Sequence, residues 1–581
     1  MPTANIASHL KEMASLHPTQ VAVHFPVGRK ASGRNQYVSR TYRQLDDESD
    51  WLAAGLDEIG IGPGMKTVLM VPPSLEFFAL TFALFKVGAI PVLVDPGMGI
   101  KNLGKCLAEA QPAGFVGVTK AHVARVLFGW ARPWIKQTVT VGRRLFWGGW
   151  GLKNVVDRGR DRQTANDTKR HWQSPAVSDD QTAAILFTSG STGVPKGAVY
   201  SHGNFTAQVA ALKQAFQIQP GEIDLCTFPL FALFAPALGM TAVVPRMDFT
   251  RPALVDPNEI ETPVKQFAIN NLFGSPALLN RVGRRLFPQA DSTSAANDPN
   301  KLRAIPRWTS LRRVLSAGAP VSPLILERFT RLLGDGVQVF TPYGATESLP
   351  VAVIGSEEIL GETRDLTAKG AGTCVGRPVC GIEVNIIRIT DEPIAKWSDD
   401  LLLPRGEIGE IIVHGPMVTQ SYFNRPDLTS LAKIHDDASG RMRHRMGDVG
   451  YVDEHGRLWF CGRKSHRVVT ADRTYFTDPV EGVFNTHPAI FRTALVGVLK
   501  NGQVQPVLCV ERESENTVAA SRHLDDHELI AELQAIGTRF DHTRPIETFL
   551  FHQKFPVDIR HNSKIFREKL AVWAAQVLER R

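Results

Sequence analysis

Short apolar runs alternate with longer amphipathic segments through the first part of the chain. The runs KTVLMVPP, AIPVLVD, GFVGV, AAILFT and IDLCTFPL have the length of buried strands, and segments such as LEFFALTFALFKVG and TAQVAALKQAF between them have the length of helices. This alternation predicts α/β layers built around mostly parallel sheets. A chain of 581 residues is longer than one hydrophobic core normally serves, so at least two domains are expected.

The pattern changes near Gly406. The runs GEIGEIIVHG and VGYVDEHGRLWFCGR alternate at short range between turn residues, which predicts a small β unit. Mixed α/β texture returns after CGRKSH and ends in the helical segment SKIFREKLAVWAAQVLERR. We therefore predict a large N-terminal domain (1–461) of two mostly parallel sheets with packed helices plus the β unit, a hinge (462–465), and a small α+β C-terminal domain (466–581).

Composition and targeting signals favour a cytoplasmic protein. The six cysteines are scattered without a C-x-x-C pair, and the N-terminus shows no basic segment followed by an apolar core. Residues 77–97 could be mistaken for a membrane span, but Lys86, Gly88 and Pro91 interrupt them. A buried helix followed by a buried strand is the better interpretation.

The net charge of +8 is concentrated in one region. Residues 125–170 contain eleven Lys or Arg and three Asp, so their net charge equals that of the whole chain, and they include the tryptophans Trp130, Trp134, Trp147 and Trp150. A basic, Trp-rich insert at about 127–170 fits docking to a membrane surface or a partner protein. A solvated, mobile basic loop fits equally well. Nothing elsewhere in the chain supports a nucleic-acid partner.

The run AAILF leads into a loop rich in Gly, Ser and Thr, which is closed by PKG. Such a loop exposes backbone N–H groups and hydroxyls that can surround phosphate oxygens, and its lysine adds a positive charge. A flexible linker is the alternative, but a linker would not ordinarily follow a buried strand. The loop does not have the Walker spacing, and by itself it does not identify the reaction. Its candidate phosphate-binding residues are Thr188, Ser189, Gly190, Ser191, Thr192, Gly193 and Lys196.

A second group of polar residues lies in FTPYGATESL and the segments around it. Glu347 is an oxygen ligand of the kind that Mg²⁺ accepts, Thr346 can hydrogen-bond a phosphate, and Tyr343 beside Gly344 offers a flat face for a base. Upstream, a predicted strand ends at a backbone edge that could meet adenine, formed by Gly318, Ala319 and Pro320.

Three further candidates follow toward the C-terminus. Asp448 in MGDVG is a carboxylate suited to two ribose hydroxyls, Arg463 in GRKSH can hold the same nucleotide, and Lys564 follows an Asn-Ser pair near the C-terminus. Each residue alone has an ordinary structural explanation, such as a turn, a core contact or a solvated lysine. Their order along the chain is what favours a nucleotide site.

The motifs FTSGSTGVPKG, YGATE, MGDVG, GRKSH and the late lysine resemble, in sequence and order, those of the acyl-adenylate-forming superfamily. This superfamily includes acyl-CoA synthetases, luciferases and peptide-synthetase adenylation domains, and the resemblance extends from HPTQVAV to SKIFREKL. It implies that the large domain holds ATP and Mg²⁺ and that the small domain is a mobile lid carrying the catalytic Lys564. The lid would pivot at Lys464 and Ser465.

The resemblance also implies a role for each motif. The loop from Thr188 to Lys196 would hold the β- and γ-phosphates, and Gly318 to Pro320 with Tyr343 would bind adenine. Thr346 would bind the α-phosphate, Glu347 the Mg²⁺, and Asp448 with Arg463 the ribose. Lys564 would neutralise charge as a carboxylate attacks the α-phosphorus, because both groups are anionic.

Several positions depart from the superfamily pattern. Ala471 and Asp472 stand where glycines are common after the hinge, and a carboxylate there disfavours a phosphate-bearing thiol. Met446 and Ala232 replace a frequent threonine and histidine. The strings VDPGMG, SYFNRP, HRMGDVGY, GVFNTHPA and FPVDIRHNSKIFREKL are similar to the olefin β-lactone synthetases of bacterial long-chain hydrocarbon biosynthesis.

That resemblance implies activation of a long-chain 2-alkyl-3-hydroxy acid as acyl-AMP, followed by attack of its own 3-hydroxyl to release AMP and a β-lactone. The insert would then dock to a membrane surface or to other enzymes of the hydrocarbon pathway. A long-chain acyl-CoA ligase and a catalytically silent acyl- or AMP-binding scaffold are the alternatives.

Two long alkyl chains require an apolar tunnel. FPLFALFAPALGM and NLFGSPALL are candidate linings, and ordinary core packing is the alternative for both. His202 follows the phosphate loop, but His-Gly-Asn just as easily begins a helix, and the sequence identifies no general base for the 3-hydroxyl. The candidate acyl-binding residues are Phe231, Phe234, Gly274 and Ser275.

Overall fold

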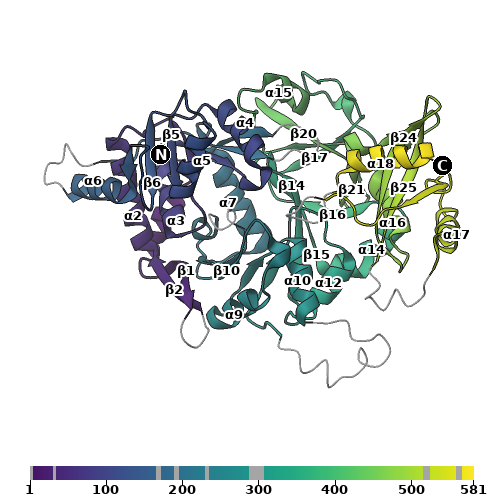
Figure 1. The fold of residues 1–581 in the computed structure, drawn as a ribbon, viewed down its shortest axis with the longest axis horizontal. Helices are drawn as coiled ribbons and strands as arrows, with labels where there is room; N and C mark the ends of the chain where they lie inside the picture. The colour runs from purple at the N-terminus through teal and green to yellow at the C-terminus, as the bar shows by residue number, and fades with distance from the viewer. Residues whose placement is uncertain are drawn as a thin grey trace.

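Two large β-sheets and the helices that pack on them form most of the chain in the computed structural model (Figure 1). The two termini lie in opposite halves of the molecule. The structure describes residues 4–29, 35–164, 172–188, 195–228, 234–286, 307–513, 524–557 and 565–580.

The first sheet has seven strands and is parallel apart from the hairpin at its edge. Its order is β7 (Trp150–Gly151), β6 (Gln137–Val141), β5 (Gly114–Val118), β3 (Lys66–Met70), β4 (Ile90–Val94), β8 (Thr182–Thr188) and β9 (Lys196–Ser201). Only β8 and β9 pair antiparallel. The helices of this region are α2 (Tyr42–Glu58), α3 (Leu75–Lys86), α4 (Ile100–Ala110), α5 (Thr119–Leu127) and α6 (Leu152–Thr164).

The second sheet has fourteen strands and changes character along its width. Its order is β17 (Glu383–Ile387), β18 (Gly409–His414), β20 (Arg441–Val452), β21 (Leu458–Arg463), β16 (Thr373–Pro378), β15 (Ser348–Gly355), β14 (Gln338–Ala345), β13 (Arg313–Leu315), β12 (Asn271–Phe273), β10 (Ile223–Cys226), β11 (Thr241–Val243), β1 (Val21–Arg29) and β2 (Asn35–Thr41), with β19 (Lys433–Asp436) beside β20. Pairing is parallel from β1 to β14 and antiparallel from β14 to β17.

The β unit expected after Gly406 is therefore not a separate sheet. Its strands continue the second parallel sheet through β15 and β16, which lie well before that position in the chain. The sequence pattern did not predict this continuous sheet, because the pairing of β16 with β21 joins segments that are far apart in the chain. Helices accompanying this sheet are α1 (Ser8–Leu16), α7 (His202–Phe216), α9 (Asn258–Phe267), α10 (Pro276–Leu286), α12 (Pro323–Thr330), α13 (Ser356–Glu358), α14 (Arg364–Ala368) and α15 (Pro426–Ala432).

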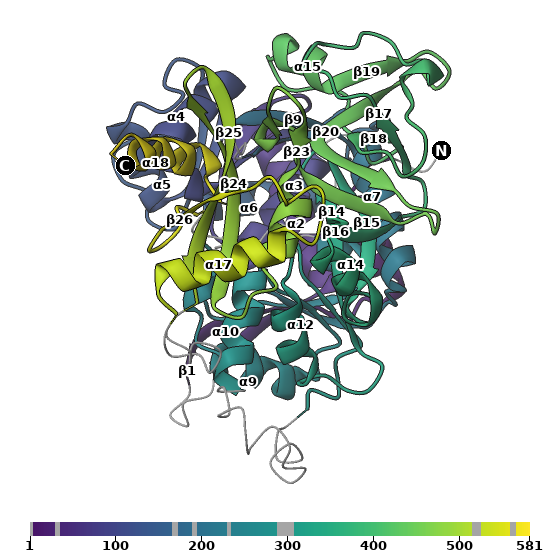
Figure 2. The ribbon, with the colours of Figure 1, turned by 90° about the vertical axis from the view of Figure 1, so that its right-hand side faces the viewer.

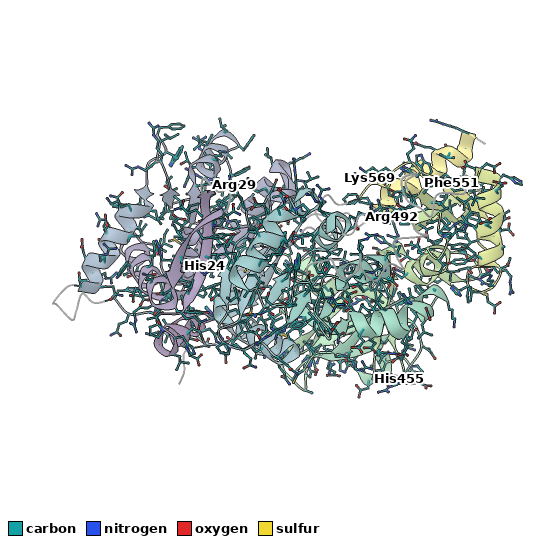
Figure 3. The ribbon with its side chains drawn as sticks, turned by 90° about the horizontal axis from the view of Figure 1, so that it is seen from below. His24, Arg29, His455, Arg492, Phe551 and Lys569 are labelled. Atoms are coloured by element: carbon teal, nitrogen blue, oxygen red, sulfur yellow. The ribbon has the colours of Figure 1, made fainter. Side chains whose placement is uncertain are left out.

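The C-terminal part has its own three-stranded sheet. The sheet consists of β24 (Ile490–Lys500), β25 (Gln503–Arg512) and β26 (Thr548–Phe551). The same part of the chain contains a separate two-stranded ribbon of β22 (Val468–Val469) and β23 (Thr474–Tyr475) and the helices α16 (Thr477–Phe484), α17 (Asp526–Gly537) and α18 (Arg567–Arg580). It faces the viewer in Figure 2, and its labelled residues lie at the opposite end of Figure 3 from those of β1. The predicted α/β class with a smaller C-terminal unit is confirmed; the mobility of that unit stays a prediction.

Helix α3 settles the interpretation of residues 77–97. Its N-terminus is capped by Ser74, whose hydroxyl accepts a hydrogen bond from the N–H of Phe77, and every residue of the helix except Glu76 is buried. Gly88 ends it at φ +71°, and strand β4 follows. A helix then a strand is what the sequence predicted. No helix in the described ranges is long and apolar enough to cross a membrane.

Much of the basic insert is folded into the first sheet rather than looped out. It supplies β6, β7 and α6, and α6 packs directly on α2. At Gly159 a Cβ atom would lie 1.7 Å from the carbonyl oxygen of Trp51, so only glycine permits this close approach. The insert is therefore not a single solvated loop over the described residues up to 164, because it contains two strands and a helix; residues 165–170 lie outside the described part.

Candidate active site

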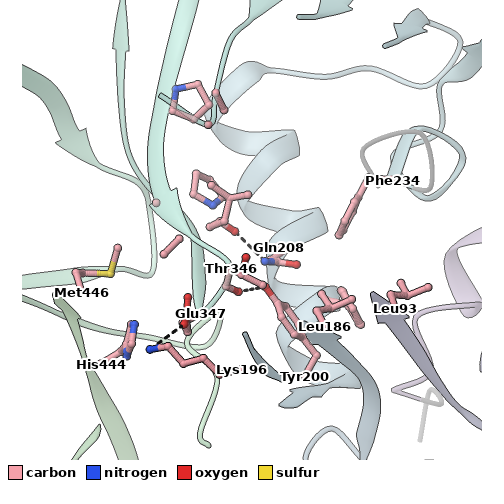
Figure 4. A pocket seen from close by; sticks show the side chains of 18 of the residues that line it. Leu93, Leu186, Lys196, Tyr200, Gln208, Phe234, Thr346, Glu347, His444 and Met446 are labelled. Atoms are coloured by element: carbon pink, nitrogen blue, oxygen red, sulfur yellow. Dashed lines mark hydrogen bonds and ion pairs between the residues drawn. The ribbon is translucent and has the colours of Figure 1, made fainter. Parts of the chain in front are cut away.

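A cavity of about 840 Å³ lies between the two large sheets and reaches the start of the C-terminal part. Charged residues gather at one end and aromatic and aliphatic residues at the other (Figure 4). The charged end includes Lys196, Glu347, Arg463 and Lys464. This division matches what an enzyme needs if it joins an ionic nucleotide to an apolar acid.

Glu347 stands at the centre of the charged end, in the turn between β14 and β15. Tyr422 donates its hydroxyl proton to Glu347 Oε1 over 2.5 Å, and Lys196 donates to the oxygen of the same hydroxyl over 3.0 Å. The Lys196 ammonium also lies 4.0 Å from Glu347 Oε1 and 4.4 Å from the centre of the Tyr422 ring. Two predicted residues are thus joined through a tyrosine that sequence reasoning quoted in SYFNRP but gave no role.

Glu347 is ionised although it is buried. Burial would raise its pKa, but the Lys196 ammonium and the Tyr422 hydrogen bond outweigh burial, and the pKa lies at about 2. An ionised, buried carboxylate is a suitable hard ligand for Mg²⁺. Within the described ranges no group of three or more His, Cys, Asp or Glu could hold a metal, so such an ion would take its other ligands from substrate phosphates and water.

Two further basic residues surround this carboxylate and were missed as site residues. Lys433 is buried and donates to the hydroxyl of Thr419 over 3.1 Å, and burial lowers its pKa to about 7. His444 lines the cavity, and its Nδ1 contacts the carbonyl of Ala432 at 3.1 Å. Burial lowers the pKa of His444 well below its usual range, so its ring is neutral at pH 7. His444 is cross-strand partner to Lys433, a pairing of β19 with β20 that single-sequence reading could not reveal.

The predicted ribose ligands, Asp448 and Arg463, contact each other and Tyr343. Asp448 is buried and lies opposite Arg463 in the β20–β21 pair, with Arg463 Nη1 2.9 Å from Asp448 Oδ1. Tyr343 donates its hydroxyl proton to Asp448 Oδ2 over 2.6 Å, and its ring packs against Phe460. Arg463 lines the cavity, whereas Asp448 and Tyr343 stand behind it. Asp448 would have to exchange a partner before it could hold ribose hydroxyls.

The ends of the predicted phosphate loop are held together by a hairpin. Thr188 lies directly opposite Lys196 in the β8–β9 pair, so the chain leaves and returns at one place on the cavity wall. Residues Ser189, Gly190, Ser191, Thr192 and Gly193 lie outside the described part of the chain.

The predicted adenine edge is only partly brought to the cavity. Gly318 lines it with φ +95°, a conformation that favours glycine, whereas the next two residues, Ala319 and Pro320, do not line it. Gly344 and Thr346 both line the wall, and Thr346 accepts a hydrogen bond through its carbonyl from the hydroxyl of Tyr200.

The predicted hinge residues Lys464 and Ser465 line the charged end. Lys464 donates to the carbonyl of Thr390 over 2.8 Å and lies 3.2 Å from Glu410, a buried carboxylate of β18. The predicted catalytic Lys564 lies outside the described residues. The residue after it, Ile565, is buried in the C-terminal core and pairs with Val557 in an isolated bridge.

The apolar end contains two of the four predicted acyl residues. Phe234 and Ser275 line the cavity, and Phe231 lies outside the described residues. Gly274 precedes Ser275 but does not line the cavity; a Cβ there would meet Leu278 and Leu279 of α10 at 3.1 Å. The sequence missed most of this wall, because its residues read as ordinary core. They include Ile6, Phe82, Phe85, Phe205, Leu212 and Phe216.

His202 is explained by packing rather than chemistry. It is buried at the first turn of α7, where Ser201 and Asn204 form a capping box. Its Nδ1 accepts the backbone N–H of Ile6 at 3.3 Å, and its ring lies edge-on to Phe85. Burial lowers the pKa of His202 to about 4, so its ring stays neutral.

The fold and the two-ended cavity define a nucleotide-dependent acid-activating enzyme, and comparison with known proteins agrees. The profile of a family described as "AMP-binding enzyme" matches residues 10–423, and the chain belongs to this family. Within it, the chain is 50% identical to the olefin beta-lactone synthetase of Xanthomonas campestris pv. campestris, over 98% of each chain. It is 49% identical to the olefin beta-lactone synthetase of Stenotrophomonas maltophilia, over 99% of each chain.

Solved structures share the fold at much lower identity. The amide bond synthetase McbA from Marinactinospora thermotolerans aligns with a TM-score of 0.73 and 22% identity, over 98% of this chain and 99% of that one. ATP-bound MatB from Rhodopseudomonas palustris aligns with the same TM-score and 18% identity, over 99% of both chains. The long-chain-fatty-acid–CoA ligase of Escherichia coli O6:H1 is more distant in sequence, at 24% identity over 82% of each chain.

Proposed function

We propose that this enzyme activates a long-chain 2-alkyl-3-hydroxy acid with ATP as acyl-AMP and then closes it to a β-lactone, releasing AMP and diphosphate. The observation that carries the proposal is one continuous cavity with an ionic end around Glu347 and an apolar end large enough for alkyl chains. The 50% identity to an olefin beta-lactone synthetase supports the second step.

The residues of the charged end suit the first step. Lys196 and the loop that it closes would hold the outer phosphates, and Thr346 would contact the α-phosphate. Glu347 would hold Mg²⁺, which when bound would offset the negative charge of the phosphates. Lys564 would place its ammonium between the acid carboxylate and the α-phosphate. Positioning and charge compensation supply most of the catalysis in reactions of this kind.

The second step needs no separate acceptor molecule, because the 3-hydroxyl belongs to the substrate. An intramolecular attack benefits from effective molarity, and the phosphoric anhydride of acyl-AMP is a good leaving group. Asp472 argues against a thiol acceptor: hydrogen bonding from Thr470 lowers its pKa, so it is charged at neutral pH. A negative charge beside the hinge would repel a phosphate-bearing thiol.

Product analysis separates this function from an acyl-CoA ligase. With ATP, Mg²⁺ and a long-chain 2-alkyl-3-hydroxy acid, we expect AMP release and β-lactone in equal amounts, at a rate that does not change when CoA is added. The matched acid without the 3-hydroxyl should support ATP–pyrophosphate exchange but give no lactone. NMR at low temperature avoids thermal loss of CO₂. Thioester formed only with CoA would contradict the proposal, and absence of AMP release with every acid would favour a silent scaffold.

We further propose that the insert docks this enzyme to an anionic membrane surface. Leu127 at the end of α5 and Phe146 in the β6–β7 loop are 74% and 79% exposed, and Arg143 and Arg144 beside Phe146 are also exposed. The loop packs against α5, because Trp147 stacks on His122 with 5.3 Å between ring centres. Exposed apolar side chains among arginines suit a lipid headgroup region, which would retain an apolar product.

The double variant Leu127→Ser, Phe146→Ser should bind vesicles containing phosphatidylglycerol at least about tenfold more weakly, since two large apolar side chains lose their insertion. Vesicle co-sedimentation measures this. Leu254→Ser is the control, because Leu254 is 70% exposed on another part of the surface. Equal binding by the double variant and the wild type would refute membrane docking; loss of pull-down with another pathway enzyme instead would assign the surface to that protein.

A further inference from the structure

The N-terminal segment forms part of the apolar wall of the cavity. Ile6 lines the cavity and is only 5% exposed, although it lies before the first helix, α1. Its backbone N–H is held by Nδ1 of His202, and the neighbouring Asn5 donates through Nδ2 to the carbonyl of Phe85 over 2.8 Å. These two hydrogen bonds fix the N-terminal segment against α3 and α7, which lie far from it in the sequence.

Ile6 lies at the opposite end of an aromatic series from the charged residues. The series starts at Thr346, whose carbonyl accepts the Tyr200 hydroxyl. Tyr200 stacks on Phe205 with 4.7 Å between ring centres, and Phe205 packs edge-on against Phe85 at 5.8 Å. His202, which holds Ile6, follows at 6.2 Å from Phe85. Figure 4 shows two other apolar lining residues, Phe234 and Leu93, on the far side of Tyr200 from Glu347.

We propose that Ile6 closes the far end of the acyl cavity and limits the length of the alkyl chain that the enzyme accepts. This inference rests on the proposed function, because it takes the apolar end as the acyl site. The side chain would meet the terminal methyl of a chain that runs along Phe205 and Phe85. His202 and Asn5 then act as positioning residues, since they fix the segment without facing the substrate's reacting atoms.

Ile6 differs from the lining residues of α3 in that it belongs to no helix or strand. Thr81, Phe82 and Phe85 are buried residues of α3, so changes there disturb the core. Ile6 stands outside any helix or strand, and its replacement changes the end wall with less effect on the sheets. A hydrophobic pocket distinguishes one methylene by about tenfold or more, so a wall residue of this size has a measurable effect on chain length.

The test compares Ile6→Ala with the control Leu10→Ala in ATP–pyrophosphate exchange over a series of acids that differ by two carbons. Leu10 is fully buried in α1 but does not line the cavity, so its variant reports the effect of weakening the same segment. For Ile6→Ala we expect the preferred acid to lengthen by at least two carbons, with the kcat/KM ratio of the longer to the shorter acid raised about tenfold. Leu10→Ala should keep the wild-type ratio.

Ile6→Phe should shift the preference in the opposite direction, toward shorter acids. Thermal unfolding of each variant shows whether the fold persists. If both Ile6 variants are folded and keep the wild-type length profile, the inference is overturned while the proposed function stands. If the wild-type enzyme shows no exchange with any long-chain acid, the proposed function itself fails.

Discussion

Lys564→Ala is expected to lower ATP–pyrophosphate exchange by at least about 10²-fold while leaving ATP affinity nearly unchanged. The reason is that the carboxylate and the α-phosphate repel each other, and a positive charge placed between them acts mainly in the transition state. Removal of one such stabilising group commonly costs about 10² to 10³ in kcat. Exchange kinetics with radiolabelled diphosphate measure the first effect, and calorimetric titration with ATP measures the second.

Lys554→Ala is the matched control for this variant. Lys554 belongs to the same C-terminal part and is exposed, so its loss removes one positive charge without altering the cavity. It should exchange at the wild-type rate. Lys564→Arg keeps the charge but changes its shape, and partial activity is expected from it. Near-normal exchange by Lys564→Ala would show that another cation performs this task.

The fold class could be predicted because its signals are local. Buried runs such as KTVLMVPP and AIPVLVD became β3 and β4, and the glycine at position 88 ended α3 as expected. The joining of the predicted β unit to the second parallel sheet was not predictable, since it depends on β15 and β16 pairing with distant strands. Sequence periodicity reports which face of a strand is buried but not which strand lies beside it.

The charged end of the cavity was predictable because its residues lie in short motifs. Glu347 and Lys196 are found within 4.0 Å of each other at the cavity, although 151 positions separate them. Tyr422, which connects them, lies in SYFNRP, a segment to which the sequence analysis gave no role in the site. The apolar end was predicted poorly for a physical reason: Phe85, Phe205 and Ile6 are buried, and a residue lining an apolar cavity has the same sequence signal as one in the core.

Burial affects the ionisable groups of the charged end differently. Glu347 stays ionised because Lys196 and the Tyr422 hydroxyl compensate its desolvation, whereas His444 and Lys433, which lack comparable compensation, have their pKa values lowered by burial. The cluster therefore keeps one well-defined anion surrounded by basic groups of which His444 is neutral at pH 7. In such an arrangement the carboxylate can bind a cation, and the neutral His444 limits the repulsion between positive charges around it.

The second large effect is expected from Glu347→Gln, which should lower exchange by about 10² to 10³-fold and raise the Mg²⁺ concentration needed for half-maximal rate. The amide has the size of the carboxylate but no charge, so it binds a hard cation weakly. Loss of the Glu347 charge also removes the group that raises the pKa of Lys196. Exchange measured across a Mg²⁺ titration, with calorimetry of Mg²⁺–ATP binding, provides the two readouts.

Tyr422→Phe separates the charge of Glu347 from its positioning. This variant keeps the carboxylate but removes the hydroxyl that donates to Glu347 and accepts from Lys196. A loss of about tenfold is expected, which is the size of one hydrogen bond to a charged group, with the Mg²⁺ dependence close to that of the wild type. If Glu347→Gln and Tyr422→Phe instead lose equal activity at every Mg²⁺ concentration, the carboxylate acts by holding Tyr422 and Lys196 in place, because a metal ligand would make the glutamine variant alone depend on added Mg²⁺.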